Sequence, residues 1–244
     1  MFYKNKFNIK SVFVLGSSSE VAKQICIKLA KKGCTRFHLL TRDLNNNKEL
    51  INTLKKYNIP NLTQEIFDLN EETKEIPNVD QFDLYLITAG RLGDSELARN
   101  DLLEANKILN VNYGGLLRWL TAIATTERFK TKSKLWIFSS VAGDVGRPSN
   151  YHYGAAKAAL TCFCNGLFLR AYRKPFSIRI FKAGYIYTRM SIGKAPKILC
   201  ISPSKLAKIV LSNPNKRGIE YLPWWWSIII KIVQIVPTSI KSKL

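Results

Sequence analysis

The sequence predicts a single α/β domain in which a parallel sheet is covered by helices on both faces. Two observations lead to this prediction: apolar runs of strand length recur along the chain, and helical stretches separate them. Strands that alternate with helices form parallel sheets, because each crossover helix returns the chain to the same edge of the sheet. The chain has 244 residues, 46% of them hydrophobic, which fits one such domain with a full core.

About seven strands are expected from the apolar runs. They are Ser11–Gly16, Arg36–Thr41, Leu62–Phe67, Asp83–Thr88, Lys134–Ser139, Ser177–Phe181 and a short one near 218–222. The first helix should carry Val21, Ile25 and Leu29 on one face, because these residues recur at helical spacing. Longer helices are expected over roughly 104–128 and about 152–172.

The first strand runs directly into a turn of small residues, Gly16-Ser-Ser-Ser-Glu-Val-Ala. A glycine at a strand end permits a tight turn, and the amides at the start of the next helix can bind a phosphate. Glu20 and Ala22 stand where the usual second and third glycines would be, so an ordinary strand-to-helix turn stays an alternative. The cofactor contacts expected in this turn are Gly16, Ser18, Ser19 and Val21.

Further cofactor contacts are expected where the next strands end. Arg42 follows the second strand, and a basic group there favours the 2′-phosphate of NADP(H) over NAD(H), although Asp43 beside it weakens the argument. Metal binding is not expected, because the five cysteines have no metal-ligand spacing. The remaining expected cofactor contacts are Asp68 and Leu69, which could equally form a plain surface turn, and Ala89 and Gly90.

Four residues form a candidate catalytic constellation. Tyr153 and Lys157 are four residues apart and therefore share a helix face. An ammonium group beside a phenol lowers the phenol's pKa, so Tyr153 could donate a proton near neutral pH. Ser140, thirteen residues before Tyr153, can hydrogen-bond a substrate carbonyl, and Asn112 in the preceding helix can hold a water that links Lys157 to solvent. A Tyr-x-x-x-Lys pair alone is weak evidence for a function, because the two residues are often four positions apart by chance. Together with Ser140, Asn112 and the turn after the first strand, the pair predicts a ketone reductase.

These residues resemble the short-chain dehydrogenase/reductase superfamily from about Lys10 onward. The family's Asn-Ser-Tyr-Lys tetrad matches the four candidate catalytic residues, and its Asn-Ala-Gly motif matches Thr88-Ala89-Gly90. The resemblance implies a doubly wound, Rossmann-type fold and a nicotinamide cofactor that also contacts Tyr153 and Lys157. The family motif Pro-Gly-x-x-x-Thr appears with alanine in place of proline, and it implies that Gly184, Ile186 and Thr188 hold the nicotinamide carboxamide.

A narrower resemblance is to the decaprenylphosphoryl-2-keto-β-D-erythro-pentose reductase subgroup. It is carried by the segments A-G-R-L-G-D at 89–94, N-V-N-Y at 110–113, S-S-V-A-G-D at 139–144 and T-R-M-S at 188–191. The subgroup resemblance implies reduction of the 2-keto group of a polyprenylphosphoryl pentofuranose. This reaction completes a ribose-to-arabinose 2′-epimerisation in the synthesis of cell-envelope glycan precursors. It also implies an FAD-dependent oxidase partner. Relatives act on other sugars or lipids, and a non-catalytic nucleotide-binding subunit is a further alternative.

The C-terminal part of the chain, residues 223–244, is assigned to a helix and tail that follow the reductase domain at residues 1–222. Its apolar run, Trp224–Val236, is 13 residues long, whereas a helix that spans a bilayer needs roughly 20. Tryptophans at one end and lysines at the other suit a helix in the membrane interface. A helix that packs on the core or joins a homo-oligomer is the alternative. The helix expected over this apolar run has one narrow polar stripe, which comprises Ser227, Lys231, Gln234 and Thr238.

The formal net charge of +21 is concentrated toward the C-terminus. Residues 170–244 hold 15 Lys or Arg and a single acid, Glu220. Such a surface can attract anionic lipid or a phosphorylated substrate, which Arg189 and Lys194 could contact. No nucleic-acid-binding motif accompanies the charge, so nucleic acid is not an expected partner. The N-terminus has no signal-peptide pattern. We therefore expect a cytoplasmic protein, peripheral on the inner face of the plasma membrane if the helix binds lipid. Ser191–Ser202 is the segment expected to be most mobile.

Overall fold

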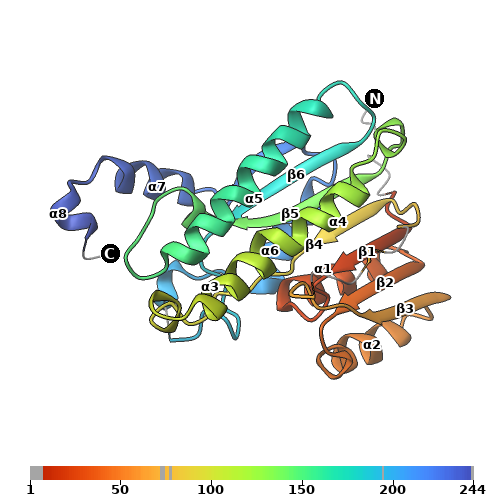
Figure 1. The fold of residues 1–244 in the computed structure, drawn as a ribbon. Helices are drawn as coiled ribbons and strands as arrows, with labels where there is room; N and C mark the ends of the chain where they lie inside the picture. The colour runs from red at the N-terminus through yellow and green to blue at the C-terminus, as the bar shows by residue number, and fades with distance from the viewer. Residues whose placement is uncertain (1–7, 72–74, 77–78, 194, 243–244) are drawn as a thin grey trace.

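The structure is a computed structural model that describes residues 8–71, 75–76, 79–193 and 195–242. Its centre is a seven-stranded parallel sheet in the order β3-β2-β1-β4-β5-β6-β7 (Figure 1). The strands are β1 (Ser11–Leu15), β2 (Arg36–Thr41), β3 (Asn61–Ile66), β4 (Leu84–Ile87), β5 (Lys134–Ser140), β6 (Ser177–Ala183) and β7 (Gly218–Leu222). The predicted seven-stranded sheet is confirmed, with strand ends that differ by at most two residues. The strand order reverses at β1 and β4, the place where such sheets bind ligands.

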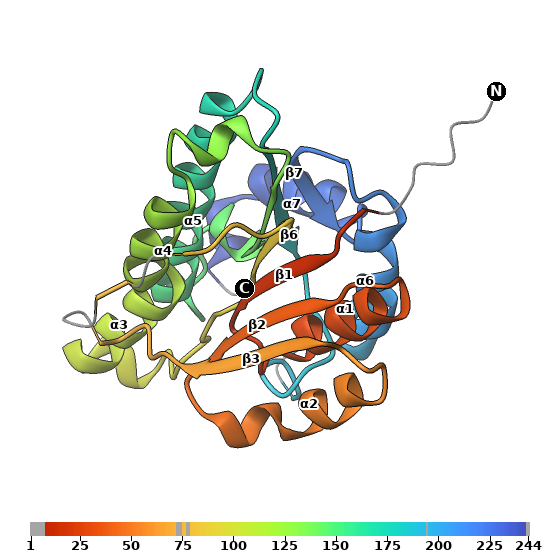
Figure 2. The ribbon, with the colours of Figure 1, turned by 90° about the vertical axis from the view of Figure 1, so that its right-hand side faces the viewer.

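Helices cover both faces of the sheet (Figure 2). On one face lie α1 (Glu20–Lys31), α2 (Lys48–Lys55) and α6 (Pro203–Ser212), and on the other lie α3 (Leu102–Leu109), α4 (Gly115–Ile123) and α5 (Tyr151–Arg170). The doubly wound, Rossmann-type fold is therefore confirmed. Because both faces are buried, the central strands are nearly continuous apolar runs, and this is why they can be recognised in the sequence.

The long helix expected over roughly 104–128 is interrupted and ends earlier. Between α3 and α4, residues Asn110–Gly114 form a π-helical turn, and α4 ends at Ile123. A π-turn widens the helix by one residue per turn and commonly occurs at functional sites. Apolar periodicity does not reveal this insertion, because the buried residues on either side still lie on one face.

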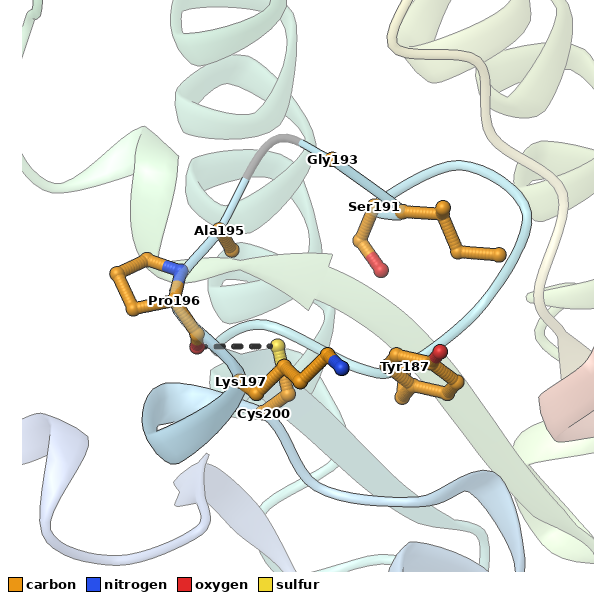
Figure 3. A pocket seen from close by; sticks show the side chains of 8 residues that line it. Tyr187, Ser191, Gly193, Ala195, Pro196, Lys197 and Cys200 are labelled. Carbon is orange, nitrogen blue, oxygen red and sulfur yellow. Dashed lines mark hydrogen bonds between the residues drawn. The ribbon is translucent and has the colours of Figure 1, made fainter.

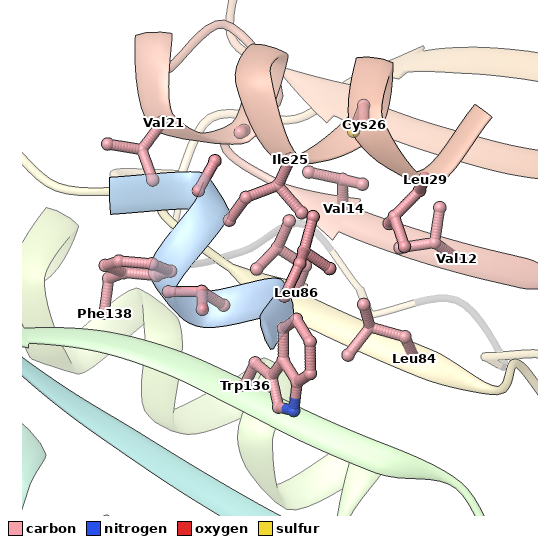
Figure 4. Close-up of a cluster of buried hydrophobic side chains, with 14 of the residues drawn as sticks. Val12, Val14, Val21, Ile25, Cys26, Leu29, Leu84, Leu86, Trp136 and Phe138 are labelled. Atoms are coloured by element: carbon pink, nitrogen blue, oxygen red, sulfur yellow. The ribbon is translucent and has the colours of Figure 1, made fainter. Parts of the chain in front are cut away.

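The packing of α1 confirms the face predicted for it. Val21, Ile25 and Leu29 are buried against β1 and β4 side chains, in the cluster shown in Figure 4. The helix therefore has a fixed position on the sheet. This places its first turn, beginning at Glu20, next to the end of β1.

The C-terminal residues form two helices beyond β7. They are α7 (Trp226–Ile235) and the short α8 (Thr238–Lys241), separated at Pro237. One side of α7 packs on the domain, where Trp226 and Ile230 are buried with Val141. None of the helices in the described part of the chain combines the length and the apolar character needed to cross a bilayer.

Candidate functional site

The predicted catalytic pair lies in the first turns of α5. Tyr153 and Lys157 share a helix face, and the Lys157 Nζ lies 5.8 Å from the centroid of the Tyr153 ring. The Tyr153 hydroxyl is hydrogen-bonded to the side chain of Ser140, the last residue of β5. The structure thus brings three of the four predicted catalytic residues together at the carboxyl end of β5.

Burial sets the acid–base character of this pair. Lys157 is 3% exposed, and its ammonium donates a hydrogen bond to the carbonyl of Phe138 (3.3 Å). Burial lowers the pKa of Lys157 to about 8. Burial raises the pKa of Tyr153, and the hydrogen bond with Ser140 and the charge of Arg147 only partly oppose it. The expected lowering of the phenol's pKa is therefore wrong for this geometry, in which the ammonium bonds a carbonyl oxygen. A raised pKa keeps Tyr153 protonated, as a proton donor must be.

The fourth residue, Asn112, enters the site from the π-turn. Its side chain is fully buried: Nδ2 donates to the carbonyls of Arg91 (2.6 Å) and Ile108 (2.8 Å), and Oδ1 accepts from the Arg91 amide (3.2 Å). A Cβ added to Gly90 would lie 3.2 Å from the Asn112 Oδ1 and 3.4 Å from the Lys157 Nζ. Gly90 therefore lies between Asn112 and Lys157. The water that Asn112 could hold stays a prediction.

The turn after β1 requires its glycine. Gly16 has φ +90°, and a Cβ there would lie 2.4 Å from the backbone nitrogen of Ala89. The two predicted glycine-containing turns thus contact each other at the point where the strand order reverses. Ser19 occupies the N-cap position of α1 without forming a side-chain cap hydrogen bond. The Ser19 side chain therefore does not cap the backbone amides in the first turn of α1, and amides at the start of a helix suit a bound phosphate. In this respect the residues present fit a dinucleotide.

The residue that replaces the second glycine has a partner that the sequence did not indicate. The Glu20 carboxylate accepts hydrogen bonds from the Nε (3.0 Å) and the backbone amide (3.2 Å) of Arg189, which follows β6. Burial would raise the pKa of Glu20, but hydrogen bonds from its own amide and from Arg189 outweigh it and lower the pKa. An ion pair therefore joins the nucleotide turn to the loop after β6. Residues 169 positions apart can be paired only in the folded chain.

Arg42 and Asp43 differ in whether their side chains are available to contact a cofactor. The Asp43 carboxylate accepts hydrogen bonds from the Asn45 amide (2.9 Å) and the Asn46 side chain (3.1 Å), so it caps its own turn. Arg42 is exposed at the end of β2. In the same way, Asp68 accepts from the amide of Asn70 (3.0 Å), which supports the alternative of a surface turn, while Leu69 beside it is buried.

The predicted nicotinamide loop lies against the C-terminal helix. A Cβ added to Gly184 would lie 1.8 Å from the Nε1 of Trp226, and this indole nitrogen has no hydrogen-bond partner among the described residues. Ile186 pairs with Ile201 in a parallel bridge, and the Thr188 amide donates to the Ser191 hydroxyl (3.1 Å). Trp226 thus lies against the predicted nicotinamide loop, a contact that the sequence did not indicate.

Beyond Thr188, the chain encloses a pocket of about 410 Å³ (Figure 3). Its lining combines apolar and basic side chains: Tyr187, Ser191, Ile192, Gly193, Ala195, Pro196, Lys197 and Cys200. Lys194 lies outside the described residues, as does Lys243 of the tail. The mobility expected for Ser191–Ser202 stays a prediction.

Several residues of the subgroup motifs form hydrogen bonds and ion pairs that hold loops in place. Arg91 donates to both carboxylate oxygens of Glu104 (2.7 Å each), and Glu104 also accepts from the Asp94 amide (2.9 Å). Asp144 pairs with Lys182 and accepts a hydrogen bond from the Tyr221 hydroxyl (3.0 Å). These contacts fix the loops after β4 and β5, and therefore position the catalytic side chains. No cluster of metal-ligating side chains occurs in the described ranges.

The family model for short chain dehydrogenases matches residues 10–198. The chain belongs to this family. An uncharacterized oxidoreductase of Mycobacterium tuberculosis is 29% identical over 160 residues, which cover 65% of this chain and 64% of that protein. The 3-oxoacyl-(acyl-carrier-protein) reductase FabG of Escherichia coli is 23% identical over 189 residues, covering 76% of this chain and 77% of that protein. The match thus spans less than two thirds of the mycobacterial relative.

Solved structures agree with the fold. A short chain dehydrogenase from Shigella flexneri complexed with NADP superimposes with a TM-score of 0.75 at 19% identity, over 89% of this chain and 98% of that one. Actinorhodin polyketide ketoreductase with NADPH superimposes with a TM-score of 0.68 at 18% identity, over 84% of this chain and 89% of that one. At this identity, the likeness establishes the fold.

Proposed function

We propose that the chain is an NAD(P)H-dependent reductase of a ketone. The observation that carries the proposal is the placement of Asn112, Ser140, Tyr153 and Lys157 at the carboxyl ends of β4 and β5. Tyr153 lies beside Ser140 and Lys157, and Gly90 lies between Lys157 and Asn112. The turn at Gly16 lies directly against Ala89, so the two turns that are expected to hold a dinucleotide are next to each other. When bound, the nicotinamide supplies the hydride.

The chain's own residues handle the proton and the carbonyl. Ser140 donates a hydrogen bond to the substrate oxygen, and Tyr153, held protonated by burial, transfers its proton to that oxygen. Lys157 has a pKa of about 8, so near neutral pH it is mostly protonated and keeps a positive charge 5.8 Å from the centroid of the Tyr153 ring. Tyr153→Phe should lower turnover at least about a hundredfold. NAD(P)H binding, followed by fluorescence, should hardly change. Retained turnover would contradict the mechanism.

For the cofactor, we propose a preference for NADP(H). Arg42 is exposed at the end of β2, where the ribose of a dinucleotide lies in such folds. The adjacent Asp43, which could have favoured NAD(H), directs its carboxylate into its own turn. A direct comparison of KM for NADPH and NADH tests this preference.

For the substrate, we propose a 2-keto pentofuranose linked to polyprenyl phosphate, presented after oxidation by an FAD-dependent partner. The subgroup motifs support this proposal, and so does the pocket beyond Thr188, where Lys197 could contact a phosphate and Ile192 an apolar chain. The test combines the purified chain, its oxidase partner and polyprenylphosphoryl ribose, with NADH or NADPH. Formation of polyprenylphosphoryl arabinose is expected, and the Tyr153→Phe variant should not form it.

Two alternatives make different predictions in the same assay. A reductase of another sugar or lipid ketone is favoured by the similarity to FabG, and it would consume NADPH with 3-oxoacyl ketones instead. A nucleotide-binding subunit without turnover is favoured by the altered glycine motif, in which Glu20 and Ala22 stand in place of the second and third glycines. This subunit would bind NADPH and reduce no ketone in a broad panel.

A further inference from the structure

One face of α7 is apolar and exposed, on the side of the helix that does not pack on the domain. Trp224, Ile228, Ile232 and Ile235 are 70%, 49%, 54% and 81% exposed. Ile228, Ile232 and Ile235 share one face of α7, and Trp224 lies in the turn before the helix. Trp226 and Ile230 occupy the buried face. Exposed isoleucines in such a row are unusual on a soluble surface and mark an interaction site.

The loop that lines the pocket also carries exposed apolar side chains. Leu199 packs against the cluster formed by Trp226, Ile230 and Val141, so this loop lies beside α7. Two of its residues, Ile192 and Ile198, are 58% and 88% exposed. We call the exposed apolar residues of α7 and of this loop the apolar rim; it comprises Trp224, Ile228, Ile232, Ile235, Ile192 and Ile198.

The charges around the apolar rim are basic. Lys197 lies on the loop beside Ile198, and Lys231 and Lys241 lie on α7 and α8. The single acid of residues 170–244, Glu220, is buried and paired with Arg179 and Lys216. No carboxylate from this part of the sequence therefore offsets the lysines. A surface with negative charge and an apolar interior is the complementary partner.

From this combination we infer that the apolar rim docks onto the surface of an anionic lipid bilayer. Burying the rim removes apolar side chains from water, and the lysines reach the headgroups. A second copy of the chain fits less well, because two-fold symmetry would bring the lysines of both copies together without acids from residues 170–244 to pair with them.

Vesicle flotation tests the inference without substrate or cofactor, so its result is independent of the reductase assay. The full chain should float with vesicles of phosphatidylcholine and phosphatidylglycerol in equal parts, and much less with phosphatidylcholine alone. The double variant Ile228→Ser/Ile232→Ser should lower the partition coefficient about tenfold or more. The variant Lys197→Gln/Lys231→Gln should lower it about tenfold on the anionic vesicles only.

A matched control uses exposed apolar residues elsewhere. Leu169 and Tyr172 are 62% and 65% exposed near the end of α5, and Leu169→Ser/Tyr172→Ser should bind vesicles like the unmodified chain. Thermal unfolding of each variant verifies that it is folded. Failure of the unmodified chain to float, or equal loss in the control, would overturn the inference. It would also be overturned if Ile228→Ser/Ile232→Ser converted a dimer to a monomer in analytical ultracentrifugation, since the rim would then join two copies.

Discussion

The contact between Gly184 and Trp226 yields a quantitative prediction about the loop after β6. Alanine at position 184 would place a Cβ 1.8, 2.1 and 2.3 Å from three atoms of the indole, so the indole must move. Overpacking of this kind costs up to about 3 kcal/mol. Trp226→Ala instead removes a side chain that is only 5% exposed, which typically costs about 3–5 kcal/mol.

The double variant distinguishes this packing from two independent effects. When the indole is absent, the added methyl group occupies vacated space and its overpacking cost disappears. Gly184→Ala/Trp226→Ala should therefore be about 2–3 kcal/mol more stable than the sum of the single variants implies. Urea unfolding of the four proteins measures this coupling free energy. Additive single effects would refute the packing of α7 on the nicotinamide loop.

Three further predictions follow from the charged residues of the site. Burial lowers the pKa of Lys157 from 10.5 to about 8, so the folded chain binds this proton less tightly than the unfolded chain. The free energy of unfolding should therefore rise by about 3 kcal/mol as the pH increases between these two values. Urea unfolding measures this rise, and Lys157→Met should remove it. Arg42→Ala should raise KM for NADPH about tenfold and leave KM for NADH unchanged; equal effects on both would contradict a 2′-phosphate contact. In a double-variant cycle on KM for NADPH, the effects of Glu20→Gln and Arg189→Gln should differ from independence by about two- to fivefold. This modest coupling is expected because the two side chains are 32% and 67% exposed. Independent effects would show that the ion pair does not act on the cofactor turn.

The features that could be predicted from the sequence are those with a local period or a local sequence pattern. The central strands are buried on both faces and therefore read as apolar runs, and α1 shows its inner face through Val21, Ile25 and Leu29. Tyr153 and Lys157 could be paired because four residues make about one helical turn.

The features that could not be predicted depend on contacts between distant segments. Asn112 reaches the site through a π-turn, and its side chain is held there by the backbone of Arg91. The pKa of Tyr153 depends on burial and on where the Lys157 ammonium finds its hydrogen bond. The extra residue of the π-turn does not change the spacing of the apolar residues, and the hydrogen bond from Lys157 to the Phe138 carbonyl follows no sequence pattern. Neither could therefore be predicted from the sequence.

Two of the departures from the family motifs, Glu20 and the alanine before Gly184, have the same structural consequence. Glu20 replaces a glycine of the nucleotide turn and binds Arg189, while alanine replaces the proline before Gly184, against which Trp226 packs. Both contacts hold the loop after β6, one from the side of the nucleotide turn and one from the C-terminal helix. A proline restrains a loop through its own fixed φ, whereas these contacts restrain it through tertiary structure. Any force that moves α7, including its insertion into a lipid surface, would therefore act directly on the loop that is predicted to hold the nicotinamide.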